Sequence, residues 1–434
     1  MPILFSDVTV VPMDGAPQVL EHAYVAVEGT KIASVGTEPP EGTFDRVVDG
    51  AGKVLLPGFV NAHTHLPMTL MRGYAGGCDL HTWLNQYIFP AEARLDSRAV
   101  AAGAGLGLAE MIASGVTCVA DMYMHTGTIA EQILEAGISA NLSCGGVYFG
   151  APEDFSPETC GDCRNQAALT EEWHGAGAGQ ILVDASVHGE YTSNPPLWRW
   201  MAEYAAEHRL GMHVHVSETQ SEHQASLERW GKTPIQALDG CGVWDCGRSL
   251  AAHCVYTTEE DWALMAEKGI SCVHNPWSNL KLGSGVAPIP AMMRAGVNVA
   301  LGTDGMSSHN SADLFSDIKL AAVLHNGVER DPMAVNAWAA LEMATVNGAR
   351  ALGRDTGVIA PGKTADLILV DLSAPNLIPC HDPVEDLVFS AHGSNVEMNM
   401  ARGQVIYEKG SFLTLDLERV RWEVEHYALP LIFG

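Results

Sequence analysis

The chain has 434 residues, 47% of them hydrophobic, and a formal net charge of −28. This length can bury one large domain and a smaller one, and the apolar runs are too short and too broken to cross a bilayer. The acidic excess argues against binding to nucleic acid or to an anionic membrane, because phosphate binding needs clustered Lys and Arg. Composition thus excludes two kinds of partner but does not indicate a substrate.

The cysteines and the first residues bear on the cellular compartment. Cys118, Cys254 and Cys272 lie in apolar strand-like runs, which is typical of buried thiols in a reducing compartment. Residues 1–7 lack the basic region and apolar core of a secretory signal. We therefore expect a cytoplasmic protein without disulfides.

In chain order, residues 3–55 carry short strand-like pieces, such as 8–12 and 24–35, separated by turn residues. From about residue 56, strand-like runs alternate with helix-like runs. Eight strands are predicted, at 59–65, 117–123, 139–146, 181–188, 210–216, 250–253, 270–274 and 297–304. Several are continuously apolar, as expected of a parallel sheet that helices cover on its faces.

Signals of helix ends separate these strands. Asp96 is a candidate N-cap for a helix that ends at Gly115, and Thr258 could open another that ends near Gly269. Eight alternating β and α units predict an α/β fold with a TIM-type (β/α)8 barrel.

The ends of the chain differ from its middle. After a helical stretch at 333–352, strand-like pieces return at 365–372 and 396–408. We expect a barrel over residues 56–364 and a small composite β-sandwich domain built from both termini, residues 1–55 and 365–434.

Histidines and carboxylates lie where several predicted strands end. His63 and His65 end the first strand and, two residues apart, point to the same side. His215 and His253 end later strands, and Asp304 ends the last one. Imidazole and carboxylate are the ligands of open catalytic metal sites, and a TIM barrel carries its active site at these strand ends. The pattern predicts a catalytic metal site there.

Other histidines have weaker claims, because a lone buried histidine is more often structural. We expect a structural role for His125, His208, His223, His325, His392 and His426. His213 is two residues before His215 and deeper in the barrel, so it is either a neighbour of the metal ligands or a packing residue.

Over nearly its whole length the chain resembles the amidohydrolase superfamily and, within it, the methylthioadenosine/S-adenosylhomocysteine deaminases. The motifs that carry the resemblance are PGFVNAHTH (57–65), PMTLMRG (67–73), WL (83–84) with PAE (90–92), HVSET (215–219), AHCV (252–255), HNP (274–276) with SNLKLG (278–283), and LGTDG (301–305).

The resemblance implies a role for each matching residue. The metal ligands would be His63, His65, His215 and Asp304, and the catalytic groups Glu218, His253 and Asp304. Trp83 would line the pocket, Glu92 would bind the ribose hydroxyls, and His188 would contact the purine.

The implied reaction is metal-dependent hydrolytic deamination of adenosine-type nucleosides to the inosine analogue and ammonia. Members with two metals bridge them with a lysine, commonly at the end of the fourth strand, and 181–188 contains none. We therefore expect one divalent metal, with zinc ahead of iron and manganese. We also expect a small nucleoside substrate and a homo-oligomer.

One departure affects the substrate. Well-known members carry an arginine after the third strand that helps hold the amino-acid tail of S-adenosylhomocysteine, but 143–147 reads SCGGV. Arg164 is the one nearby candidate for a second such role. This favours 5'-methylthioadenosine or adenosine over S-adenosylhomocysteine.

Two other functions stay open. One is a chlorohydrolase or deaminase of another heterocycle, such as a triazine or guanine, and Glu92 argues against it because only a ribosylated substrate needs that residue. The other is a catalytically inactive scaffold, which an intact ligand set with Glu218 and His253 disfavours.

Overall fold

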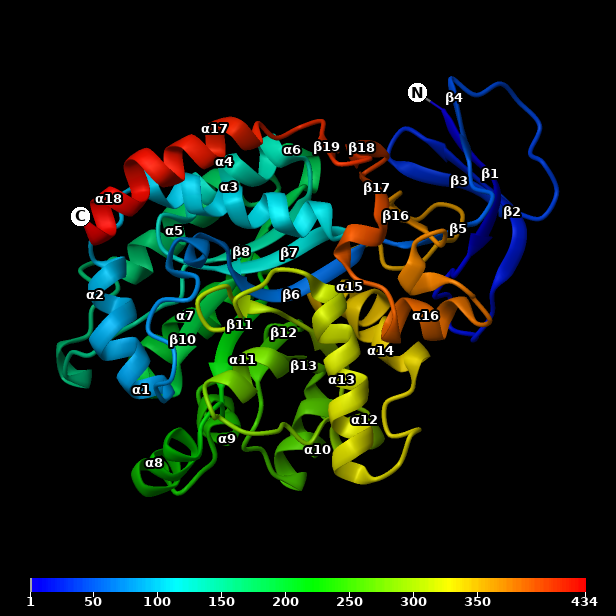
Figure 1. Cartoon of the computed structure of the whole chain (residues 1–434). Coiled ribbons are helices and arrows are strands. Elements are labelled where there is room, and N and C mark those ends of the chain that lie inside the picture. The colour runs from blue at the N-terminus through cyan, green and yellow to red at the C-terminus, as the bar shows by residue number, and fades with distance from the viewer. Residues whose placement is uncertain (1) are drawn as a thin grey trace.

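In the described part of the chain, the strands form three sheets, two of them parallel (Figure 1). The computed structural model describes residues 2–434. Each parallel sheet has five strands, in the orders β15-β6-β7-β8-β9 and β10-β11-β12-β13-β14, and the third sheet has nine. The predicted α/β class with parallel strands is therefore confirmed.

The ten parallel strands correspond to the eight predicted ones. They are β6 (Phe59–His65), β7 (Val116–Met122), β8 (Ser139–Ser143), β9 (Ile181–Val183), β10 (Ala185–Gly189), β11 (Met212–Val216), β12 (Ser249–His253), β13 (Ile270–His274), β14 (Val299–Leu301) and β15 (Asp304–Gly305). Every residue of β6, β7, β8, β11, β12 and β13 is buried. Both faces of these strands are thus covered, which explains their unbroken apolar runs.

Two predicted strands are each interrupted. The fourth divides at Asp184, whose carboxylate accepts a hydrogen bond from Arg248 (2.5 Å); β9 before it pairs with β8, whereas β10 after it pairs with β11. The eighth divides after β14, where the Thr303 amide donates to the Asn61 side chain (3.0 Å). Each interrupted strand therefore takes part in both parallel sheets.

Both predicted helix starts are confirmed, whereas the helix predicted to end at Gly115 ends at Ala113, with Ser114 as its C-cap. The Asp96 carboxylate accepts a hydrogen bond at the start of α3 (Ser97–Ala113). Thr258 opens α10 (Glu259–Lys268) in a reciprocal capping box, which satisfies two amides that the helix leaves free. Gly269 ends α10 at a φ of +67°, a conformation that costs glycine little.

The remaining helices connect the strands or follow the last parallel one. The α-helices are α1 (Leu80–Trp83), α2 (Phe89–Glu92), α4 (Thr126–Ala136), α5 (Gly161–Trp173), α6 (Ala176–Gly179), α7 (Pro195–His208), α8 (Gln220–Trp230), α9 (Pro234–Asp239), α11 (Pro276–Lys281), α12 (Ile289–Arg294), α13 (Leu314–Glu329), α14 (Ala337–Ala344), α15 (Val346–Leu352), α16 (Pro383–Phe389), α17 (Leu417–Glu423) and α18 (Leu429–Phe433). Two π-helical turns, η2 (Leu84–Ile88) and η7 (Val424–Ala428), extend α1 and α17. Within residues 2–434, no helix combines the length and apolar character that a membrane span requires.

The nine-stranded sheet joins the two ends of the chain. Its strands are β1 (Ile3–Val10), β2 (Leu20–Glu28), β3 (Lys31–Gly36), β4 (Arg46–Asp49), β5 (Lys53–Pro57), β16 (Leu367–Asp371), β17 (Val396–Ala401), β18 (Gln404–Glu408) and β19 (Ser411–Phe412). β5 pairs with β1 on one side and with β16 on the other. The strand-like run predicted at 24–35 is a hairpin of β2 and β3, because Gly29 turns the chain at a φ of +58°.

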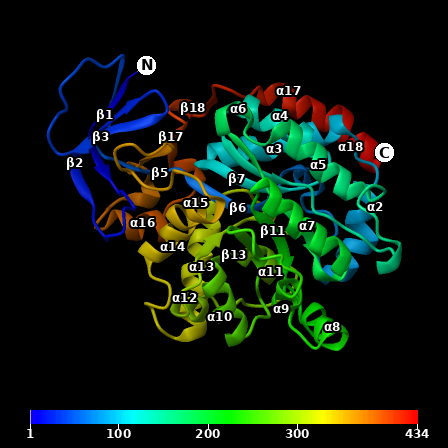
Figure 2. The same ribbon diagram turned by 180° about the vertical axis from the view of Figure 1, so that it is seen from behind.

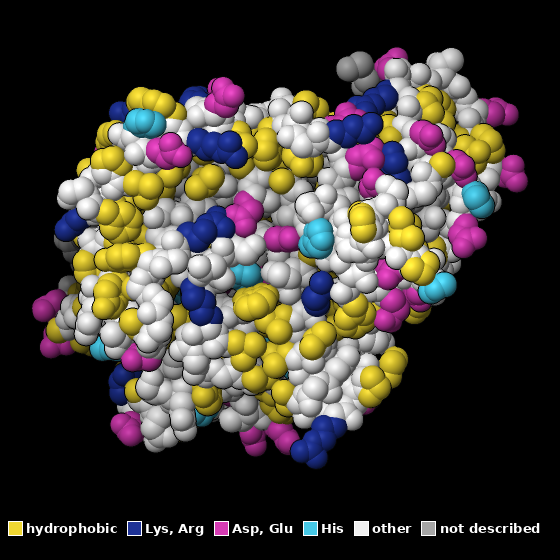
Figure 3. Space-filling model, in the orientation of Figure 1, with side chains coloured by type: hydrophobic (Ala, Val, Ile, Leu, Met, Phe, Trp, Pro, Cys, Tyr) yellow, Lys and Arg dark blue, Asp and Glu magenta, His cyan; other side chains and the backbone are white. Residues whose placement is uncertain are grey.

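The last helices lie away from this sheet. α17 and η7 pack along α3, and α18 contacts α2, at the opposite end of the molecule from the N-terminal strands (Figure 1; seen from behind in Figure 2). On the face drawn in Figure 3, the Lys and Arg side chains of the described residues are scattered among acidic and apolar ones. That face therefore offers no basic patch for a phosphate backbone.

Candidate functional site

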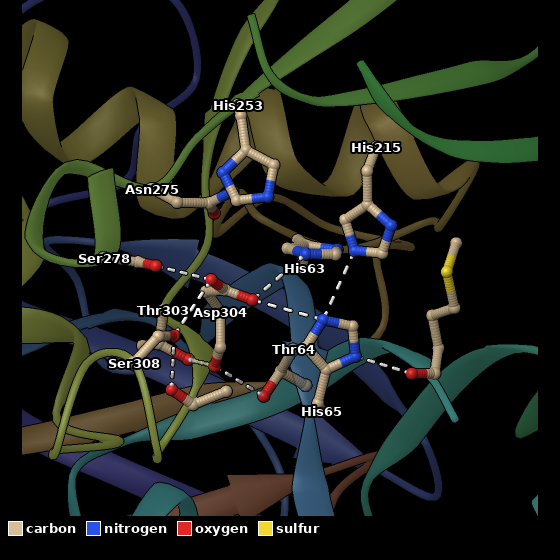
Figure 4. Close-up of polar contacts among 12 residues, drawn as sticks. His63, Thr64, His65, His215, His253, Asn275, Ser278, Thr303, Asp304 and Ser308 are labelled. Atoms are coloured by element: carbon tan, nitrogen blue, oxygen red, sulfur yellow. Dashed lines mark hydrogen bonds and ion pairs between the residues drawn. The ribbon is translucent and has the colours of Figure 1, made fainter. Parts of the chain in front are cut away.

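The carboxyl ends of four parallel strands bring five predicted residues together. Within each of two sets, His63–His65–Asp304 and His63–His215–His253, one candidate ligand atom per residue lies within 4.8 Å of the others. All five side chains are buried. Figure 4 shows His63, His65, His215, His253 and Asp304 turned toward a common centre.

The short distances in this cluster join the tips of the side chains. Asp304 Oδ1 lies 3.4 Å from His63 Nε2 and 3.2 Å from His65 Nε2, and His215 Nε2 lies 3.3 Å from His65 Nε2. Three Nε2 atoms and one carboxylate oxygen therefore converge. The structure brings the four predicted ligands to one point.

The other ring nitrogen of each histidine has its own partner. His65 Nδ1 donates to the Met122 carbonyl and His215 Nδ1 to the His188 carbonyl, both at 2.6 Å. Because the protons are held on Nδ1, the Nε2 lone pairs are free to face the centre. This is the arrangement of metal-binding histidines.

Burial favours neutral imidazoles at two of the three positions. Burial lowers the pKa of His63 to about 3 and holds the pKa of His215 well below its usual value. Burial would also lower the pKa of His65, but its contact with Asp304 raises it to about 9. His63 Nε2 is buried and has no hydrogen-bond partner among the described residues. A cation bound at its lone pair would satisfy this nitrogen. The donor set fits a divalent metal of the zinc kind.

Asp304 is fixed from behind. Its Oδ2 accepts hydrogen bonds from Ser278 Oγ (2.5 Å) and Ser308 Oγ (3.0 Å), which leaves Oδ1 for the histidines. Burial would raise the pKa of Asp304, but the neighbouring His63 and His65 side chains hold it well below the usual value. The carboxylate is therefore ionised.

Backbone strain is concentrated at these strand ends. Ser217, His253 and Asp304 have φ values of 52°, 77° and 61°. Left-handed conformations at residues other than glycine cost free energy, and they cluster at functional sites. The strained backbone at these three residues thus determines the direction of their side chains.

Glu218 and His253 lie beside the cluster. Glu218 Oε2 is 3.8 Å from His253 Nε2, and Glu218 Oε1 accepts a hydrogen bond from Ser284 Oγ (3.4 Å). Burial raises the pKa of Glu218. A glutamate of raised pKa is suited to donating and accepting a proton near neutral pH.

A cavity of about 410 Å³ opens above the cluster. It is lined by the predicted residues Trp83, Glu92, His188, Glu218 and His253, together with the tips of the metal-ligand candidates other than His63. Among the described residues that line it, none is Lys or Arg. The lining residues therefore offer carboxylates but no lysine or arginine side chain to an occupant.

Glu92 and His188 are both held in place. Tyr123 Oη donates to Glu92 Oε1 at 2.6 Å, and burial raises the pKa of Glu92. His188 Nδ1 lies 3.0 Å from Thr192 Oγ1, and burial lowers the pKa of His188 to about 4. His188 is thus neutral, with its other nitrogen free for an occupant.

Comparison with known proteins gives the family. Residues 54–406 match the model of the Amidohydrolase family. The chain belongs to the amidohydrolase family. It is 41% identical over 436 residues to a 5-methylthioadenosine/S-adenosylhomocysteine deaminase of Caldanaerobacter subterraneus subsp. tengcongensis, covering 100% of this chain and 99% of the relative.

Two further relatives bear on the activity. A 5'-deoxyadenosine deaminase of Methanothermobacter thermautotrophicus is 40% identical, with 95% of each chain covered. The crystal structure of an adenosine deaminase from Xanthomonas campestris with bound zinc has a TM-score of 0.92 and 33% identity, covering 99% of this chain and 98% of that one. The resemblance to deaminases of this family is confirmed.

In this amidohydrolase, Arg164 does not reach the cavity. It is exposed, and its guanidinium donates to the carbonyls of Glu158 (2.9 Å) and Thr159 (3.1 Å). The residue of this segment that lines the cavity is Asp162. The interpretation of Arg164 as a holder of a carboxylate tail is therefore not supported by its position.

Sequence reasoning left several site residues without a role. His213 Nε2 lies 2.8 Å from His63 Nδ1, and His213 Nδ1 lies 3.4 Å from Ser143 Oγ, so His213 supports a metal-ligand candidate rather than only packing. Tyr123 is the first residue after β7, and this position at a strand end could have predicted a place in the site. Ser278 lies in the quoted motif SNLKLG (278–283) but was given no role, and Ser308 carries no signal of its own.

Proposed function

We propose that the chain is a metal-dependent aminohydrolase that converts adenosine-type nucleosides to the inosine analogue and ammonia. The observation that carries this proposal is one cavity that joins a four-ligand cluster, a buried acid–base pair and a separate buried carboxylate, Glu92. The relatives named as deaminases of methylthioadenosine, S-adenosylhomocysteine and 5'-deoxyadenosine support it.

His63, His65, His215 and Asp304 would hold one divalent cation. Zinc is the first candidate, because a zinc-bound neighbour shares the fold, and iron and manganese are alternatives. A divalent cation in such a site supplies an activated water as nucleophile at neutral pH. The end of β10 carries His188 and no lysine, which supports a single cation.

The chain's own groups would move the protons. His253 and Asp304 would accept the proton of the attacking water. Glu218 would donate a proton to the ring nitrogen next to the attacked carbon, and its raised pKa favours the protonated form that this step needs. Trp83 would pack on the nucleoside, His188 would contact the purine, and Glu92 would accept hydrogen bonds from the ribose hydroxyls.

The two parallel sheets would together form one barrel. The strand pairings that link both parallel sheets, with the bridge from Gly146 to Val187, support closure into a (β/α)8 barrel over residues 56–364. The strands from both termini would form the composite β-sandwich domain predicted over residues 1–55 and 365–434. The packing of α17 and η7 on α3 supports assigning the last helices to the barrel. A homo-oligomer and a cytoplasmic location stay predictions.

Loss of the partner of a metal ligand should weaken metal binding. His213→Leu removes the contact to His63 Nδ1, and we expect a roughly 10–100-fold lower zinc affinity. Competition with a chromogenic chelator measures this directly. The exposed His208 on α7 provides the control, His208→Leu, which should bind zinc as the wild type does. Equal affinity for the wild type and His213→Leu would contradict the proposed support.

The cavity also predicts a substrate order. Methylthioadenosine and adenosine should have a higher kcat/KM than S-adenosylhomocysteine, because the described residues of the cavity lining include no lysine or arginine to pair with a carboxylate tail. Free adenine should be a poor substrate, because it lacks the ribose hydroxyls that would donate to the buried Glu92.

Glu92→Ala tests the same order on the protein side. It should reduce kcat/KM for nucleosides by roughly tenfold or more and change the low rate on adenine little. Steady-state kinetics on the four compounds measures this. A preference for S-adenosylhomocysteine would require another holder of its tail, and a preference for adenine or a triazine would overturn the assignment to nucleosides.

A further inference from the structure

The ring of His253 is held from the side that faces away from the cavity. His253 Nδ1 lies 2.8 Å from Asn279 Oδ1, and both residues are only 1% exposed. The opposite nitrogen, Nε2, faces Glu218 at 3.8 Å. The partner of Nδ1 therefore decides whether Nε2 carries a proton or a lone pair.

Two amide side chains compete for this nitrogen. Asn279 presents an oxygen, which accepts a proton from Nδ1, whereas Asn275 presents Nδ2 at 3.3 Å, which requires Nδ1 to be unprotonated. One nitrogen cannot serve both. The Asn279 contact is 0.5 Å shorter and lies within the normal range of an N–H···O hydrogen bond, which the Asn275 contact exceeds, so it favours a proton on Nδ1.

Asn279 is also connected to Glu218. Its backbone carbonyl accepts a hydrogen bond from the Ser284 amide at 2.8 Å, and Ser284 Oγ donates to Glu218 Oε1 at 3.4 Å. Asn279 lies on α11, directly after β13, and its own amide donates to the Asn275 carbonyl (3.1 Å). One buried residue thus contacts His253 directly and Glu218 through a single serine.

We propose that Asn279 is a positioning residue that sets the tautomer of His253. It keeps a proton on Nδ1, so that Nε2 offers its lone pair to the proton of the attacking water. When Nε2 has taken that proton, the other proton stays on Nδ1 and is donated as a hydrogen bond to Asn279 Oδ1, so the ring carries the positive charge. This inference rests on the proposed function, in which His253 accepts that proton.

The tautomer can be observed in the intact zinc-loaded protein. Two-bond ¹H–¹⁵N correlation spectra of ¹⁵N-histidine-labelled protein distinguish protonated from unprotonated ring nitrogens, and a His253→Asn variant identifies the signals. We expect His253 to be protonated on Nδ1. Protonation on Nε2 alone would overturn the proposal, whatever the variants of Asn279 do.

Two variants of nearly equal size give the kinetic test. Asn279→Asp keeps an acceptor for Nδ1, so its kcat should stay within about tenfold of the wild type, whereas Asn279→Leu should lower kcat by about 100-fold or more with little change in KM. In Asn279→Leu only the Asn275 amide remains beside Nδ1, so the spectrum should show the proton moved to Nε2.

The outcomes distinguish failure of the proposed deaminase function from failure of the proposed role of Asn279. A wild type with no deaminase activity on any nucleoside would refute the proposed function itself. An active wild type that Asn279→Leu matches in kcat, or that loses as much with Asp as with Leu, would refute the role of Asn279. If the Leu variant does not fold, as judged by its zinc content and thermal unfolding, the spectrum of the wild type decides.

Discussion

Replacing Glu218 by Gln should remove most of the deaminase activity while metal binding is retained. Gln keeps the size of the side chain and an oxygen for Ser284, but it cannot donate and accept the proton. Loss of a general acid–base group typically costs 10²–10⁴-fold, so we expect a fall in kcat of that order. Ammonia release under saturating methylthioadenosine, with elemental analysis of the same sample, measures both quantities.

Glu228, an exposed residue of α8, provides the matched control. Glu228→Gln removes the same charge without touching the cavity, and it should retain wild-type kcat. If Glu218→Gln also keeps near-normal kcat, then Glu218 is not the proton donor, and the assignment of the acid–base pair is wrong.

The second large effect concerns the metal. His215→Ala removes one of the converging Nε2 atoms. We expect it to lower the zinc affinity by more than the roughly 10–100-fold expected when a residue that only hydrogen-bonds a ligand is lost. Activity should fall with metal occupancy and recover in part at high zinc concentration. His208→Ala, on the exposed end of α7, should leave both properties unchanged.

Metal stoichiometry extends the same test. Purified wild type should hold about one divalent ion per chain. Two tightly held ions would contradict a single site, and wild-type zinc affinity in His215→Ala would remove His215 from the ligand set. No bound metal, together with no gain of activity on adding metal, would favour an inactive scaffold.

The sequence was sufficient for much of the site because its residues end predictable strands. His63, His65, His215, His253 and Asp304 each follow or end an apolar run, and parallel strands bring their carboxyl ends to one edge. The structure places all of them at one cluster. Their roles in metal binding and catalysis stay predictions, because geometry alone does not measure either.

Other features depend on contacts that sequence spacing does not encode. Asn279 reaches His253 from a short helix 26 residues later, and Tyr123 reaches Glu92 across 31 residues. Neither pair has a periodicity that would reveal it. The break at Asp184 was missed for a similar reason, since it depends on Arg248 from a distant segment.

Ammonia release by the zinc-loaded wild type is the decisive measurement for deamination of adenosine-type nucleosides. The compounds compared are methylthioadenosine, adenosine, S-adenosylhomocysteine, guanine and a triazine. The product of each is identified by its absorbance and mass. We expect one ammonia per inosine-type product, the highest kcat/KM on methylthioadenosine or adenosine, and loss of turnover when the metal is removed. Turnover of guanine or a triazine with none of any nucleoside would contradict this expectation.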